Sequence, residues 1–206
     1  MHSMTAPTST PSRHAGRWSR TAHRHPYGRH EAALHQFGDT MIADAQAAGR
    51  PLTVVVFEQA DLPELHVLFG SEAARTVTAK FNQQLQALAG SRGLAMRSDA
   101  TTWTVLMPGL DHAQAKSEVE RVFGPSLAVD VESEGEEILL VPTMEVRTVV
   151  RGAAPMRRIY QEMRGRIAGT LQRQQRREEV LRAERERHSR PAPLTWAATA
   201  PARAVQ

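Results

Sequence analysis

The sequence contains no cysteine among its 206 residues and no long apolar run. Without thiols the chain can form neither disulfides nor thiolate metal sites, and it has no cysteine nucleophile. No segment approaches the roughly 18 apolar residues that span a membrane, and the N-terminus lacks the apolar middle region of a secretory signal peptide. We therefore expect a soluble, cytoplasmic protein with one folded domain and tails.

Basic residues are concentrated at the two ends of the chain. The net charge is +4, but residues 1–30 carry +5 and residues 151–206 carry +8, which leaves −9 for the middle. Basic tails can bind nucleic acid or an anionic membrane surface through phosphate contacts. Charge runs more often stay in solvent, and aromatic platforms for single strands are missing near these arginines. Nucleic acid and membrane surfaces therefore remain only alternative partners of the tails.

Hydrophobic periodicity predicts a helix over about 31–48, followed by a β-α-α-β-β-α-β-β order of elements. The β-branched run from Leu52 to Phe57 is typical of a strand buried on both faces. Two helical pieces within 61–89 meet at Gly70. Further strands are expected at 94–98, 103–107, 127–131 and 138–150, with a helix at 111–123 that opens on a capping box of Asp111 and Gln114.

A long helix is predicted over about 155–187, and only its first half carries an apolar stripe. Beyond Leu171 the side chains are nearly all Arg, Glu and Gln, so this part should project into solvent or contact a partner helix. Candidate partner-binding residues there are Arg173, Arg176, Arg177 and Arg182. The expected organisation is a disordered basic tail (1–29), one domain (30–170), a charged extension of the last helix (171–189) and a disordered tail (190–206).

A short polar turn separates the two strands of the predicted hairpin, in the stretch Arg97-Ser98-Asp99-Ala100-Thr101-Thr102-Trp103. This stretch and its flanks resemble the active-site hairpin of a GGDEF (diguanylate cyclase) domain, and the strand 51–57 and the pair Phe69-Gly70 keep the same register. The resemblance covers roughly 30–165. It implies an α+β fold, a GGDEF or nucleotidyl-cyclase-like palm with a central, mainly antiparallel sheet, flanking helices and a long C-terminal helix.

The resemblance also implies that the residues needed for catalysis are missing. Condensing two GTP molecules requires carboxylates that hold divalent ions against the triphosphates. The acids of the signature align with Thr101 and Thr102, and its two glycines align with Asp99 and Ala100. The remaining acid, Glu58 at the end of the first strand, is a possible residual metal ligand, although a solvent-facing role is the simpler expectation.

At other positions, too, the residues that bind nucleotide in the family are replaced in this chain. A guanine-reading Asn is replaced by His66 and a GTP-contacting Asp by Arg75, and the Arg-x-x-Asp of the inhibitory product site falls on Gly90 and Gly93. Trp103 replaces the signature Phe and is expected to be a core residue. We therefore expect no catalytic residue, no metal site and no cofactor.

The sequence thus favours a non-catalytic signalling or regulatory module of degenerate GGDEF type that acts through a protein partner. A sensor of cyclic di-GMP or another nucleotide, without turnover, is an open alternative, and so is a basic-tail binder of nucleic acid or membrane. A homodimer is possible because an exposed charged helix can pair, but the heptads after Leu171 are short.

Overall fold

The computed structural model describes residues 27–133, 135–150 and 152–189. The disorder expected for the tails concerns mainly 1–26 and 190–206, which lie outside the described residues. The elements in chain order are α1 (Gly28–Ala47), β1 (Leu52–Glu58), α2 (Leu62–Ala89), β2 (Leu94–Arg97), β3 (Thr102–Pro108), α3 (His112–Phe123), β4 (Val129–Ser133), β5 (Glu136–Leu140), β6 (Thr143–Val149) and α4 (Met156–Ser189).

A four-stranded antiparallel sheet in the order β2-β3-β1-β6 forms the centre of the fold. The strand β1 pairs with β3 on one side and β6 on the other, so that Val55 lies between Val105 and Val146. Every residue from Leu52 to Phe57 is buried, as the continuous β-branched run predicts for a central strand. The predicted α+β class with a mainly antiparallel sheet is confirmed.

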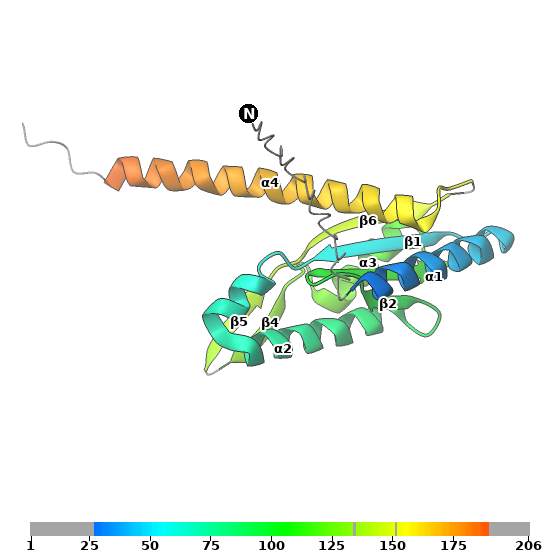
Figure 1. Cartoon of the computed structure of the whole chain (residues 1–206), viewed down its shortest axis with the longest axis horizontal. Helices are drawn as coiled ribbons and strands as arrows, with labels where there is room; N and C mark the ends of the chain where they lie inside the picture. Colours follow the sequence, from blue (N-terminus) through cyan, green and yellow to red (C-terminus); the bar gives the residue numbers. More distant parts are fainter. Residues whose placement is uncertain (1–26, 134, 151, 190–206) are drawn as a thin grey trace, which may run out of the picture.

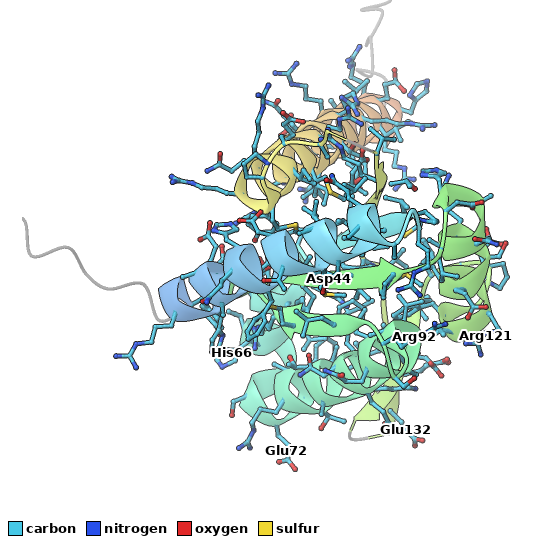
Figure 2. The ribbon with its side chains drawn as sticks, turned by 90° about the vertical axis from the view of Figure 1, so that its right-hand side faces the viewer. Asp44, His66, Glu72, Arg92, Arg121 and Glu132 are labelled. Atoms are coloured by element: carbon cyan, nitrogen blue, oxygen red, sulfur yellow. The ribbon has the colours of Figure 1, made fainter. Side chains whose placement is uncertain are left out.

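Helices cover both faces of this sheet, and each face has its own hydrophobic core (Figures 1 and 2). On one face Phe57 packs against Phe81 of α2 and Phe123 of α3, with ring centroids 5.7 and 5.6 Å away. On the other face α1 and α4 cover Val54 and Val56. The alternation of side chains along β1 sends neighbouring residues to opposite cores.

The region 138–150 differs from the single strand that we expected. It divides into β5 and β6, and β5 pairs with β4 in a separate two-stranded hairpin. Pro142 lies at the break, where it has no N–H to donate to a neighbouring strand. The first helix also differs, since it starts at Gly28 rather than near residue 31.

Local signals place the other helix boundaries well. Gly70 has a φ of 81° and separates the two pieces of α2 by a kink, as the two predicted helical pieces require. The capping box of α3 is present, because Gln114 N donates to Asp111 Oδ1 at 2.9 Å and Asp111 N donates to Gln114 Oε1 at 3.0 Å.

The first half of α4 is docked on the fold and its second half is not. Met156, Ile159, Tyr160, Met163 and Ile167 are buried, whereas every residue of 172–188 is exposed. Figure 1 shows this second half running on beyond the edge of the sheet. In the part of the chain that the structure describes, no helix is long and apolar enough to cross a membrane.

Candidate functional site

The turn between β2 and β3 is tied to the end of β1 by backbone hydrogen bonds. Within the turn, Ser98 N and Asp99 N both donate to the carbonyl of Thr102, at 2.9 and 3.2 Å. Gln59 N donates to the carbonyl of Thr101 at 2.8 Å. The β1–β3 register then places Glu58 opposite Thr102. Residues that are 43 and 44 positions apart in the sequence therefore share one site.

Glu58 is half-buried, and both of its carboxylate oxygens are hydrogen-bonded. Thr102 Oγ1 donates to Glu58 Oε2 at 2.7 Å, and Thr101 Oγ1 donates to Oε1. The expectation of a merely solvent-facing Glu58 therefore needs correction. Thr101 and Thr102 supply two hydroxyl protons to the carboxylate, and these hydrogen bonds stabilise its charge.

Asp99, at the tip of the hairpin, is paired with α4. Arg164 Nη1 lies 2.9 Å from Asp99 Oδ2, and both side chains are partly buried. Burial disfavours the charge of Arg164, but the neighbouring Tyr160, Asp99 and Glu58 raise its pKa above the usual value for arginine. A fixed positive charge thus faces both carboxylates of the site.

A buried hydroxyl network connects α4 to the base of the same turn. The Tyr160 hydroxyl donates to Ser98 Oγ at 2.9 Å, and Ser98 Oγ lies 3.3 Å from both the Thr102 carbonyl and Thr104 Oγ1. Burial raises the pKa of Tyr160, against the lowering effects of Ser98 and Arg164. The phenol therefore stays protonated at neutral pH and remains a donor.

Trp103 lies in the core directly behind the turn, with 1% of its surface exposed. Its ring meets Phe81 edge to face at 5.1 Å, and its Nε1 donates to Asn82 Oδ1 at 2.6 Å. Arg97 covers the ring, with its guanidinium carbon 4.7 Å from the ring centroid. Trp103 thus fixes the hairpin against α2 and has no free polar atom for a ligand.

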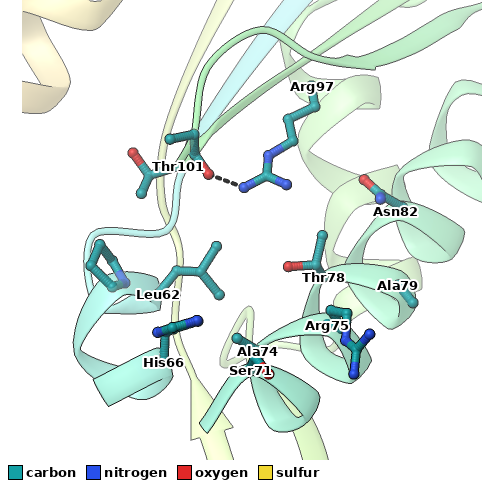
Figure 3. Close-up of a pocket in the computed structure, with 12 residues that line it drawn as sticks. Leu62, His66, Ser71, Ala74, Arg75, Thr78, Ala79, Asn82, Arg97 and Thr101 are labelled. Carbon is teal, nitrogen blue, oxygen red and sulfur yellow. Dashed lines mark hydrogen bonds between the residues drawn. The ribbon is translucent and has the colours of Figure 1, made fainter. Parts of the chain in front are cut away.

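A pocket of about 480 Å³ lies between the turn and both pieces of α2 (Figure 3). His66 comes from the first piece, Arg75 and Asn82 from the second, and Arg97 and Thr101 from the hairpin. The sequence singled out His66, Arg75 and the turn separately. Their common family register was the only signal that they share one pocket.

The remaining candidate residues lie elsewhere. Arg173, Arg176, Arg177 and Arg182 are exposed on the projecting half of α4, where Arg173 donates to Thr170 Oγ1 and Arg182 lies 3.8 Å from Glu186. Gly93 lies where α2 meets β2, and a Cβ on it would collide with the carbonyls of Ala89 and Leu106. Among the described residues, no group of three or more His, Asp or Glu side chains could hold a metal ion.

Comparison with solved structures shows that the whole fold is similar to that of GGDEF domains. The GGDEF domain of DgcB from Caulobacter crescentus, solved with c-di-GMP, is 12% identical with a TM-score of 0.60, over 69% of this chain and 84% of that one. The GGDEF domain of PA1120 (TpbB or YfiN) from Pseudomonas aeruginosa is 15% identical with a TM-score of 0.59, over 66% and 80%. The active GGEEF domain of a diguanylate cyclase from Vibrio cholerae is 12% identical with a TM-score of 0.59, over 69% and 90%.

No protein-family model matches the chain, and no curated protein matches it. At 12 to 15% identity the structural likeness shows the fold alone. The chain has the fold of a GGDEF domain, as the resemblance in the sequence implied.

Proposed function

We propose that the chain is a non-catalytic regulatory module with a GGDEF-like fold, which acts by binding a protein partner. The observation that supports this most directly is the pairing of Glu58 with Thr101 and Thr102. Where the family resemblance places metal-binding acids, this chain uses hydroxyl groups that donate to the one remaining carboxylate. The fold around the hairpin is preserved while its ionic chemistry is different.

The residues around Glu58 do not fit a magnesium site. Magnesium is held by carboxylates, carbonyls, phosphates and water in near-ideal octahedral geometry. Here both oxygens of Glu58 accept protein hydrogen bonds, and Asp99 is bound to Arg164. The charge of Arg164 acts on both Glu58 and Asp99, so it opposes a divalent cation between them. We derive no phosphoryl-transfer step for this site.

A protein partner fits the exposed half of α4 best. Every residue of 172–188 is exposed, and this part of the helix presents Val180 and Leu181, which are 55% and 43% exposed, among arginines and glutamates. A helix that exposes two adjacent apolar residues among charged ones offers them to a groove or to another helix of a partner. The similar diguanylate cyclase SiaD from Pseudomonas aeruginosa was solved in complex with its activator SiaC, which supports protein binding as a mode of action for this fold.

The absence of cyclase activity is tested by incubating the full chain with GTP and magnesium and measuring cyclic di-GMP. The active Vibrio cholerae GGEEF domain serves as the positive control in the same buffer. We expect no product above the buffer blank at enzyme concentrations where the control converts all of its GTP. Turnover by the purified chain that stops in the Glu58→Gln variant would overturn the proposal.

The partner surface is tested by capture from cells with full-length variants. Val180→Glu with Leu181→Glu should remove the partner, because burying two added charges is costly. Val67→Glu with Leu68→Glu, which changes two exposed apolar residues on α2, is the matched control and should retain it. Replacing Arg173, Arg176, Arg177 and Arg182 by Gln should weaken capture and reduce its salt dependence. Equal capture by all variants would refute a role for α4.

A further inference from the structure

The pocket between the turn and α2 is lined by basic and hydroxyl-bearing side chains but by no acidic one. His66, Arg75 and Arg97 contribute to it, together with the hydroxyls of Ser71 and Thr78, and no carboxylate lines it. Asn82 and Thr101 also line it, and the rest of the lining is apolar, with Leu62 and Ala74 buried beneath it. A cavity of about 480 Å³ is within the usual range for small-molecule sites, roughly 300 to 1,000 Å³.

Arg75 is the feature of this pocket that the fold does not explain. Most other arginines of the domain are used: Arg97 donates to the carbonyls of Asp99 and Ala100, and Arg147, Arg158, Arg164 and Arg166 have acidic partners. Among the described residues, by contrast, none forms a hydrogen bond or ion pair with Arg75 or with His66. The five N–H donors of the Arg75 guanidinium and the imidazole ring of His66 are thus free at the edge of an apolar cavity.

The donor-rich lining disfavours guanine. The guanine base presents N–H donors beside its oxygen, and these need acceptors in the protein. Among the side chains that line the pocket, the Asn82 oxygen already accepts from Trp103 Nε1, which leaves mainly hydroxyl groups, such as those of Ser71 and Thr78, as acceptors. An acceptor-only group such as a carboxylate or sulfonate fits the free donors instead, and a bidentate pair with Arg75 is the strongest contact available to it.

We propose that this pocket binds a small organic anion, an apolar body bearing one carboxylate or sulfonate, with Arg75 as the anion-binding residue. The apolar body occupies the space above Leu62 and Ala74, and the anionic group lies at the Arg75 side of the rim, across the pocket from His66 (Figure 3). The site goes beyond the proposed partner binding through α4, and it makes the domain a receptor for a metabolite of this chemistry.

The test uses two fluorescent probes that differ by one charged group. Anilinonaphthalene sulfonate is an aromatic anion, and phenylnaphthylamine is the same skeleton without the sulfonate. Titrated into the full chain, the sulfonate should bind at one site and more tightly than the neutral probe. Arg75→Gln should lower the affinity for the sulfonate by about tenfold, because one charge-assisted contact is lost. The affinity for the neutral probe should stay unchanged.

Two further variants locate the probe. Ala79→Trp fills the exposed side of the pocket and should abolish binding of both probes. Arg92→Gln, at an exposed arginine well away from His66 (Figure 2), should leave both affinities as they are. Far-ultraviolet circular dichroism of each variant checks that it is folded.

Three outcomes would overturn the proposal: equal affinity for the two probes, an Arg75→Gln variant that binds the sulfonate as the parent does, or sulfonate binding that persists in Ala79→Trp. Displacement of the sulfonate by GTP or by a short acidic peptide at lower concentration than by naphthoate would also overturn it, because the pocket would then prefer a nucleotide or a protein segment. Since α4 is unchanged in these variants, failure here leaves the proposed function standing.

Discussion

Arg164 in the docked half of α4 holds Asp99 at the tip of the β2–β3 hairpin, with 2.9 Å between Nη1 and Oδ2. The two residues are 65 positions apart in the sequence. Their contact connects α4, whose C-terminal half is exposed, with the turn that borders the pocket. The hairpin is therefore not a free loop. The conformation of the hairpin depends on how α4 packs against the sheet.

Removing this ion pair should loosen the turn more than it destabilises the fold. Because both side chains are partly exposed, Arg164→Gln should cost only about 0.2 to 1 kcal/mol of unfolding free energy. Amide hydrogen exchange of Ala100 and Thr101 should accelerate, while the centre of β1 keeps its protection. Asp99→Asn should give the same pattern, and the double variant should add nothing further. Additive effects in this cycle would contradict a direct coupling.

The hydroxyl of Thr102 should be worth more than the exposed ion pair. Its side chain is fully buried and donates to Glu58, so Thr102→Val leaves a carboxylate oxygen without that donor. The expected loss is about 1 to 3 kcal/mol, measured by urea unfolding. Combining Thr102→Val with Glu58→Gln should recover part of the loss because no charge then needs a donor. A double variant as unstable as the sum of the two singles would argue against this role.

Alkaline pH should weaken the fold through Tyr160. Burial raises the pKa of this phenol in the folded chain, despite the opposing effects of Ser98 and Arg164. The folded state therefore holds the proton more tightly than the unfolded one, so this stabilisation is complete below the ordinary tyrosine value of about 10 and is lost as pH rises through the raised pKa.

Tyr160→Phe isolates that contribution. The variant should lose roughly 0.5 to 1.5 kcal/mol at neutral pH with the hydrogen bond to Ser98, and its stability should fall less steeply above pH 10. The chain has only two tyrosines, so subtracting the variant's tyrosinate absorbance from that of the parent gives the titration of Tyr160 alone. A difference curve centred at or below the ordinary value would contradict the prediction.

The sequence predicts those features of the fold that depend on local patterns. The β-branched run from Leu52 identifies the central strand, Gly70 the kink in α2, and Asp111 with Gln114 the start of α3. The break at Pro142 was missed because the apolar residues on both sides of it continue the strand pattern. Only the pairing of the strands shows that the residues before Pro142 belong to the β4–β5 hairpin and those after it to the central sheet.

The sequence singled out three residues that the structure brings together, but it did not predict their contacts. Register with a known family located Glu58, Thr101 and Thr102, but composition cannot show that two hydroxyls donate to one carboxylate across β1 and β3. Arg164 was missed altogether. It lies on a helix with many arginines, and only the docking of α4 distinguishes the one that faces Asp99 and Glu58 from its neighbours.

Gly93 provides a test of the hairpin's seat on α2, because its role is steric. A Cβ at this position would meet two backbone carbonyls, those of Ala89 and Leu106, and neither can move without shifting the end of α2 or the strand β3. We expect Gly93→Ala to lose about 1 to 3 kcal/mol, the usual cost of overpacking. Gly90→Ala, three residues earlier, has open space around its Cβ but a φ of +63° with a ψ of −163°, so its cost should be strain of the backbone alone, about 1 to 3 kcal/mol. Urea unfolding measures both losses, and a Gly93→Ala variant as stable as the parent would show that β2 can move away from α2.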